Sequence, residues 1–189
     1  MDLSAPLHIV VMGVSGSGKT SVAQHLHDST GFPYSEADDF HPQSNIQKME
    51  SGIPLTDDDR WPWLRALRDW MSKHGDAGES TVVTCSALKR AYRDLLSEAH
   101  GNVLFVHLDG PMELIANRME LRSGHFMPRS LLPSQFDTLE TLEGDENGIT
   151  LDISQTIEEL DKQVLAIAQR SADAGGHECC PRRLQLTPP

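Results

Sequence analysis

Residues 8–20 read His-Ile-Val-Val-Met-Gly-Val-Ser-Gly-Ser-Gly-Lys-Thr, an apolar run followed by a glycine-rich loop. The loop satisfies the pattern G-x-x-x-x-G-K-[ST], whose glycines let the backbone wrap tightly and aim its N–H groups at phosphate oxygens. A strand-like run leads in and the helix-like Ser21–Leu26 leads out, which is the context that the pattern requires. The segment therefore predicts a phosphate-binding P-loop rather than a plain glycine-rich turn.

The residue types of this loop indicate ATP and Mg²⁺ as ligands. Lys19 would reach the β- and γ-phosphates, and the Thr20 hydroxyl would ligate Mg²⁺. The N-terminus of the following helix adds partial positive charge. The predicted nucleotide contacts in the loop are Gly13, Val14, Ser15, Gly16, Ser17, Gly18, Lys19 and Thr20.

Outward from the loop, short apolar runs alternate with helix-like segments, which is typical of an α/β protein with a parallel sheet. The expected strands cover 8–12, 32–35, 81–85, 103–108 and 149–153, and the expected helices 19–29, 42–51, 60–74, 88–99, 111–122 and 154–170. Ser154 is a candidate N-cap. A chain of 189 residues has the size of one domain. We expect a kinase domain over 1–170 and a disordered tail over 171–189.

The charge balance limits the classes of partner. Sixteen Lys and Arg stand against 28 Asp and Glu, a net charge of −12. Such a surface disfavours binding to nucleic acid and to anionic membranes, so an anionic ligand needs a local positive pocket. No apolar run approaches the roughly 18 residues of a membrane span. Three cysteines without framework spacing fit a reducing cytosol.

The chain lacks the guanine-reading string N-K-x-D of a GTPase. It is also short and acidic for a motor or a nucleic-acid ATPase. These features favour a kinase that acts on a small molecule.

Acidic residues follow the second expected strand, in Glu36-Ala-Asp38-Asp-Phe-His41-Pro. Open α/β sheets bind ligands at the carboxyl ends of their strands. Carboxylates there can hold Mg²⁺ through water or accept a proton from an acceptor hydroxyl. The same residues would also suit a solvated acidic loop.

Further strings extend the pattern along the chain. They are A-D-D-x-H-P at 37–42, K-M-x-x-G-x-P-L-x-D-x-D-R at 48–60, C-S-A-L-K-x-x-Y-R-D at 85–94, and G-H-F with Q-F-x-T-L-E at 124–126 and 135–140. In this order, over about 9–153, the chain resembles the gluconokinase family, which shares its fold group with shikimate and adenylate kinases. The resemblance implies a three-layer P-loop fold like that of nucleoside monophosphate kinases, with a mobile lid at about 122–140.

The resemblance also implies an activity, the ATP-dependent phosphorylation of D-gluconate at its 6-hydroxyl. The product, 6-phospho-D-gluconate, would feed the pentose phosphate or Entner–Doudoroff route. A cytoplasmic homodimer is the expected form.

Site roles follow from the same resemblance. Asp38 would take the acceptor hydroxyl, and Arg60 the substrate's carboxylate or neighbouring hydroxyls, for which a bidentate guanidinium is well suited. Glu36 stands where the family usually has Asp, and the resemblance implies a water-mediated role toward Mg²⁺ for this position. The remaining implied substrate contacts are His41, Lys48, Ser86, Lys89 and His125.

Arg118 and Arg122 are four residues apart and so share one face of a helix. In related kinases the first such arginine stacks on adenine and the second contacts phosphates, which would make Arg122 catalytic with Lys19 and Asp38. A surface pair bridged to Glu113 or Glu120 is the alternative.

Two other functions compete with this prediction. Shikimate kinase is the nearest alternative, but its third strand ends in a Gly-Gly-Gly-type turn where this chain has Cys85-Ser-Ala-Leu-Lys89. A nucleotide-binding sensor without turnover is the second, and it need not keep an acceptor carboxylate such as Asp38.

Overall fold

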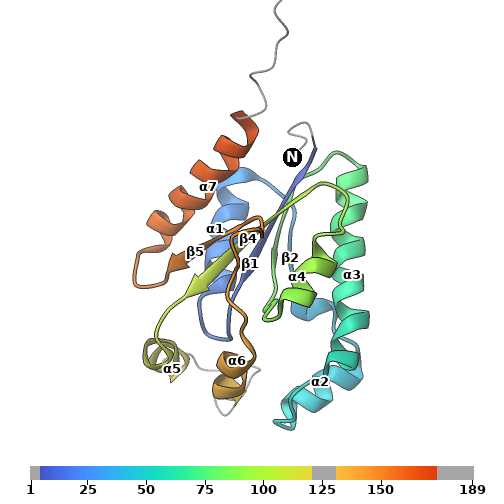
Figure 1. Ribbon diagram of the computed structural model, residues 1–189, viewed down its shortest axis with the longest axis vertical. Coiled ribbons are helices and arrows are strands. Elements are labelled where there is room, and N and C mark those ends of the chain that lie inside the picture. The colour runs from blue at the N-terminus through green and yellow to red at the C-terminus, as the bar shows by residue number, and fades with distance from the viewer. Residues whose placement is uncertain (1–4, 121–130, 174–189) are drawn as a thin grey trace, which may run out of the picture.

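The computed structural model describes residues 5–120 and 131–173, and within them five parallel strands form one sheet in the order β2-β3-β1-β4-β5 (Figure 1). The central parallel five-stranded sheet expected from the sequence is confirmed. The strands are β1 (Leu7–Met12), β2 (Tyr34–Glu36), β3 (Thr81–Thr84), β4 (Asn102–Asp109) and β5 (Gly148–Asp152). The helices are α1 (Lys19–Thr30), η1 (Ala37–Phe40, a 3-10 turn), α2 (Gln43–Glu50), α3 (Asp57–Asp76), α4 (Arg90–Leu96), α5 (Met112–Glu120), α6 (Leu132–Thr138) and α7 (Ile157–Asp173).

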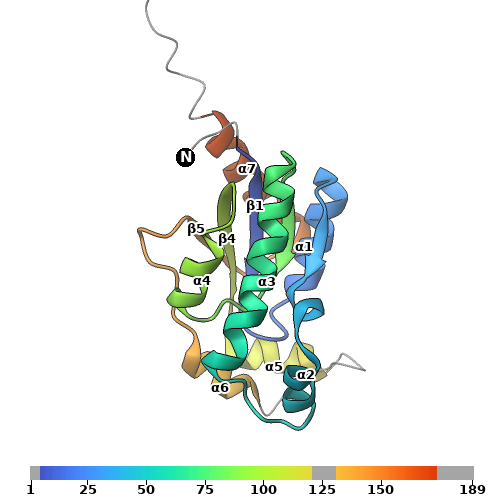
Figure 2. The same cartoon turned by 90° about the vertical axis from the view of Figure 1, so that its right-hand side faces the viewer.

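Strand β1 is buried on both faces, which explains why it reads as a continuous apolar run. Its side chains alternate between two cores. Ile9 and Val11 pack in the core that includes residues of α1 and α7, and Val10 and Met12 in the core that includes α3 and α4. Figures 1 and 2 show these helices on opposite faces of the sheet, so the molecule has three layers.

The register of the sheet decides where its loops meet. Within the sheet, Val11 lies opposite Thr84 of β3, and Met12 lies opposite His107 of β4. Because all five strands are parallel, their carboxyl ends reach the same edge, and the loops after β1, β2 and β3 gather there. This edge lies at the lower end of the molecule in Figure 1.

Several boundaries differ from those expected. Helix α3 begins at Asp57 rather than at residue 60, because Thr56 and Asp59 form a reciprocal capping box. Helix α7 begins at Ile157, and Thr156 with Glu159 makes the equivalent pair of bonds, so the expected N-cap at Ser154 is wrong. Helix α6 was not expected at all.

Some expectations lie outside the described residues. These are Arg122, His125, residues 122–130 of the lid expected at about 122–140, and residues 174–189 of the tail expected at 171–189. The division into a kinase domain and a tail stays a prediction. In the two described ranges, no helix is long and apolar enough to cross a membrane.

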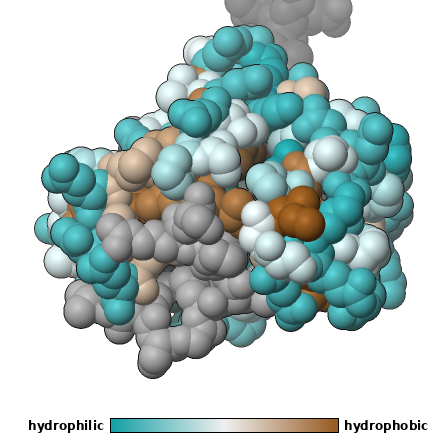
Figure 3. Space-filling model, turned by 90° about the horizontal axis from the view of Figure 1, so that it is seen from below, coloured by the Kyte–Doolittle hydropathy of each residue, from teal (hydrophilic) through white to brown (hydrophobic). Residues whose placement is uncertain are grey.

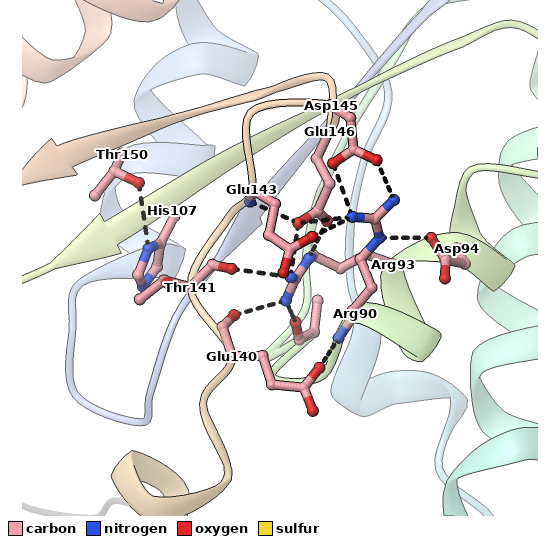
Figure 4. A network of polar contacts seen from close by, with 11 residues as sticks. Arg90, Arg93, Asp94, His107, Glu140, Thr141, Glu143, Asp145, Glu146 and Thr150 are labelled. Atoms are coloured by element: carbon pink, nitrogen blue, oxygen red, sulfur yellow. Dashed lines mark hydrogen bonds and ion pairs between the residues drawn. The ribbon is translucent and has the colours of Figure 1, made fainter.

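A buried ion pair fastens the segment before β5 to α4 (Figure 4). Arg93 of α4 is 1% exposed and donates from Nε and Nη2 to both carboxylate oxygens of Glu146. Its Nη1 donates to the carbonyls of Ala87 and Glu140, at 3.2 and 2.9 Å. The guanidinium therefore ties together three stretches of chain, at Ala87, Glu140 and Glu146.

Glu146 stays ionised in this network. Burial alone would raise its pKa, but the hydrogen bonds from Arg93 and from the Glu143 amide outweigh burial, so the pKa lies below its usual value of 4.5. A carboxylate with a lowered pKa stabilises the fold above its unfolded pKa, and this contribution is lost as the pH falls through the folded pKa.

Replacing Glu146 by Gln should lower the free energy of unfolding by about 3 kcal/mol near pH 7, because the charge of Arg93 would be left buried without its counter-ion. Urea unfolding measures the change. The matched control is Glu143→Gln, since Glu143 pairs with Arg90 but its side chain is 70% exposed, and it should cost under about 1 kcal/mol.

The difference in the free energy of unfolding between wild type and Glu146→Gln should have its full value above pH 4.5 and should shrink in more acidic buffer. Equal losses for the two variants, or a difference that does not depend on pH, would contradict the role of this pair.

Candidate active site

The P-loop connects β1 to α1 and has a backbone that only glycine adopts readily. Gly13, Gly16 and Gly18 have φ angles of 136°, 82° and 100°. A Cβ on Gly16 would lie 2.5 Å from Cγ of Met119, so α5 also leaves no room for a side chain there. The loop is thus fixed both by its conformation and by its neighbour.

The N-terminus of α1 is suited to an anion. Its N-cap is Gly18, which has no side chain to accept from the first N–H groups of the helix. Lys19 Nζ donates to the carbonyl of Val14 at 2.9 Å, which holds the ammonium group against the loop. Backbone donors, the helix dipole and a lysine therefore meet at one point, as phosphate binding requires.

The turn after β3 lies directly beside the P-loop. The amide of Gly13 donates to the carbonyl of Ser86 at 3.3 Å, and the amide of Cys85 donates to the carbonyl of Val11 at 3.1 Å. Burial raises the pKa of the Cys85 thiol to about 12, so it is a neutral wall residue and not a nucleophile.

Two carboxylates lie at the carboxyl end of β2: Glu36 is the last residue of the strand, and Asp38 follows it. Glu36 accepts hydrogen bonds from Thr84 Oγ1 at 2.7 Å and from the Tyr34 hydroxyl. Burial, then the Glu36 hydrogen bond, raises the pKa of Tyr34, so its proton stays on the phenol oxygen and is available to Glu36. Asp38 lies on η1 with its side chain 74% exposed. One acid is held firmly by two hydroxyls, and the other is accessible.

His41 and Trp63 form one wall of the cavity. Their rings stack at 4.1 Å with an interplanar angle of 20°, and Trp63 Nε1 donates to the carbonyl of Ala37. Burial, and then the charge of Arg60, lowers the pKa of His41 to about 4. Its 3.9 Å approach to Asp38 is therefore not an ion pair at neutral pH.

Gln135 of α6 is a site residue to which the sequence assigned no role. Its Oε1 accepts the amide hydrogen of Ser15 at 2.6 Å, across 120 residues of chain. Gln135 is the first residue of the Q-F-x-T-L-E string, and this position was the signal from which its place in the site could have been predicted. This bond links α6 to the P-loop, and both of its residues line the cavity.

One cavity at the carboxyl edge of the sheet collects most of the predicted site residues. Figure 3 views the molecule from this end, where apolar atoms lie between hydrophilic ones on its left and right sides. The predicted residues that line the cavity are Ser15, Gly16, Gly18, Lys19, Thr20, Glu36, Asp38, His41, Arg60 and Ser86.

Other predicted residues lie elsewhere. Lys48 Nζ donates to both oxygens of Asp59, and Lys89 Nζ donates to both oxygens of Asp57, so both lysines are paired with the first turn of α3 and neither lines the cavity. Arg118 Nη2 donates to the carbonyl of Ile153. Gly13, Val14 and Ser17 belong to the loop but do not line the cavity, and Arg122 and His125 lie in the range that is not described.

The oxygen ligands in the cavity fit Mg²⁺. Thr20, Glu36 and Asp38 supply a hydroxyl and two carboxylates. Within the described ranges no three His, Cys, Asp or Glu side chains converge on one point. Mg²⁺ keeps several waters and binds through one or two protein oxygens plus substrate phosphates. Because two hydroxyls already donate to Glu36, its remaining lone pairs suit a metal-bound water.

No protein-family model matches the chain, but individual proteins do. The gluconokinase of Gluconobacter oxydans is 50% identical over 141 residues, covering 75% of this chain and 79% of that protein. The thermosensitive gluconokinase of Escherichia coli is 43% identical over 165 residues, covering 85% and 88%.

Solved structures agree with these relatives. A sugar kinase from a Janibacter species superposes with a TM-score of 0.85 at 56% identity, covering 89% of this chain and 97% of that one. A gluconokinase from Sinorhizobium meliloti gives 0.80 at 48% identity, covering 89% and 95%. The APS kinase of Mycobacterium tuberculosis, at 17% identity and a TM-score of 0.62 over 87% of this chain and 98% of that one, shares the fold alone.

His41 should titrate with a midpoint near pH 4, because desolvation and the charge of Arg60 both disfavour the imidazolium form. NMR of protein labelled at its histidine rings measures the midpoint, and His41→Gln assigns the signal. A midpoint near 6.5, the ordinary value for histidine, would contradict the closed packing of His41 on Trp63.

Proposed function

The chain belongs to the gluconokinase family, and we propose that it transfers the γ-phosphoryl group of ATP to the 6-hydroxyl of D-gluconate. The products are 6-phospho-D-gluconate and ADP. The observation that carries the proposal is one cavity in which a phosphate-binding loop, an accessible carboxylate and an arginine lie together. The cytosolic location and the homodimeric state expected from the sequence stay predictions.

The two ends of gluconate differ in charge, and the cavity offers a matching difference. The carboxylate end of gluconate suits Arg60, whose guanidinium is permanently charged and planar. The hydroxyl end of gluconate suits Asp38, which follows β2 at the same end of the sheet as the P-loop. This orientation would bring the 6-hydroxyl toward the bound phosphates. It also supplies the local positive charge that an acidic protein needs for an anionic substrate.

Catalysis in this class of kinase consists mainly of positioning and charge stabilisation. Lys19 and the N–H groups at the start of α1 would stabilise the charge on the migrating phosphoryl group. Asp38 would orient the acceptor hydroxyl and take its proton. Mg²⁺, held by Thr20 and through water by Glu36, would neutralise charge on the phosphates. The stacked His41 and Trp63 would exclude water from the acceptor side.

The direct test is ADP release with Mg²⁺-ATP and a panel of acceptors. ATP consumption should be strong with gluconate and weak with shikimate or with no acceptor. Shikimate far ahead of gluconate would overturn the substrate assignment. Tight ATP binding with no turnover on any acceptor would favour a nucleotide sensor.

Asp38→Asn should lower kcat by about 10²–10⁴, the usual span for a general acid or base, with a much smaller change in the KM for gluconate. The amide keeps the size of the side chain but cannot take the proton. ATP affinity measured without gluconate should barely move. Steady-state kinetics and equilibrium binding measure the two effects.

Asp39→Asn is the matched control, because Asp39 is adjacent and exposed but does not line the cavity. Its kcat should stay close to that of wild type. Similar losses in the two variants would mean that a general loss of negative charge, and not Asp38 itself, slows the reaction.

A further inference from the structure

The hydroxyl group of Tyr92 lies at the centre of a polar cluster behind Arg60. Tyr92 of α4 is 2% exposed, and its ring packs edge-on against Trp61 at 5.3 Å. Its hydroxyl oxygen accepts a hydrogen bond from Arg60 Nη1 at 3.1 Å. The hydroxyl hydrogen is donated to Asp57. Tyr92 thus links an arginine of the cavity to a carboxylate in the first turn of α3.

Asp57 fixes the direction of that hydroxyl. Both of its oxygens accept from Lys89 Nζ, at 2.9 and 2.8 Å. The hydrogen bonds from Lys89 and then from Tyr92 lower the pKa of Asp57, so it remains a carboxylate that can only accept. The Tyr92 proton must therefore point at Asp57, which leaves an oxygen lone pair for Arg60.

This arrangement divides the donors of Arg60 into two sets. Nη1 is committed to Tyr92 and lies 3.6 Å from Asp57. Among the residues that the structure describes, Nε and Nη2 have no hydrogen-bond acceptor. These two groups form one edge of the guanidinium, with parallel N–H bonds that match the two oxygens of a carboxylate. Arg60 also lies over the Tyr92 ring, at 5.6 Å, which limits its rotation.

Lys89 cannot take over this role while its pairing with Asp57 lasts. Its ammonium group is neutralised by the same carboxylate that orients Tyr92. Arg60 lines the cavity, whereas Lys89 and Asp57 do not. Of the three lysine and arginine residues expected to contact the substrate in the described part of the chain, Arg60, Lys48 and Lys89, only Arg60 therefore lines the cavity, with one oriented edge of its guanidinium.

We propose that Tyr92, oriented by Asp57, is a positioning residue that presents the Nε–Nη2 edge of Arg60 to the carboxylate of the substrate. The pair thereby sets the preference of the enzyme for a sugar acid over the corresponding neutral polyol. This inference rests on the proposed function, since it deepens the role of Arg60 in that same cavity.

The test compares two ligands that differ only at the end facing Arg60. D-gluconate carries a carboxylate at C1, and D-glucitol carries a CH₂OH group there. Tyr92→Phe keeps the buried ring and removes only the hydroxyl. The KM for gluconate should rise about tenfold, the effect of one hydrogen bond to a charged group. The inhibition constant of glucitol and the KM for ATP should stay within about twofold of wild type.

A double-variant cycle shows whether Tyr92 acts through Arg60. Arg60→Lys keeps the positive charge but removes the planar guanidinium, so no bidentate edge remains for Tyr92 to orient. In that background Tyr92→Phe should therefore raise the KM for gluconate little further. Thermal unfolding of each variant separates a change in binding from a change in folding.

If Tyr92→Phe does not fold, Asp57→Asn in a Lys89→Met background makes the same comparison, because Lys89 would otherwise be released from its pairing with Asp57. The same rise is expected for gluconate and none for glucitol. An unchanged KM for gluconate, an equal weakening of both ligands, or additive effects in the double variant would overturn the inference. Failure of the wild-type protein to phosphorylate gluconate would instead remove the proposed function, so the two failures can be told apart.

Discussion

The hydrogen bond from the amide of Gly13 to the carbonyl of Ser86 joins the two halves of the site. It exists because β1 and β3 are adjacent and parallel, so the P-loop and the turn after β3 leave the sheet at one edge. A slip of one residue would turn the side chains of a strand to the opposite face and would misplace the loop that follows. The register of two buried strands therefore determines the distance between the phosphate end and the acceptor end of the cavity.

The turn after β3 depends on a second constraint on its far side. Ala87 has a φ angle of 42°, an unfavourable value for a residue with a Cβ, and its carbonyl accepts from Arg93. Arg93 in turn is neutralised by Glu146, far along the chain. The amide of Glu140 donates to the carbonyl of Leu88 at 2.7 Å, which adds another link to the same turn. The acceptor side is thus shaped by polar contacts from the segment that precedes β5.

Local patterns in the sequence were sufficient for the sheet and for the phosphate side of the site. Every predicted strand end lies within two residues of the observed one, because buried parallel strands read as apolar runs. The P-loop was predictable because the residues that form it are consecutive in the sequence. The acceptor side of the site was less predictable from the sequence. Lys48 and Lys89 belong to recognisable strings, but their pairing with α3 depends on how α2 and the turn before α4 pack against that helix, which the strings do not specify.

The same limit explains the contacts that were missed. The bond between Gln135 and Ser15 crosses 120 residues, and α6 has only seven residues with a proline near its start. A segment so short carries little periodic signal. The burial of Arg93 was equally unexpected, since arginine is rarely buried unless it is paired. Its partner Glu146 is 53 residues away and has no distinguishing spacing.

The central claim is that gluconate lies across the cavity, with its carboxylate at Arg60 and its 6-hydroxyl at Asp38 facing the P-loop. A crystal structure with Mg²⁺, a non-hydrolysable ATP analogue and gluconate tests this orientation most directly. We predict the O6 atom within about 2.6–3.2 Å of an Asp38 carboxylate oxygen, the reach of a general base, and the carboxylate against the Nε–Nη2 edge of Arg60. Gluconate bound in the reverse direction, or outside the cavity that Lys19 and Asp38 share, would contradict the account.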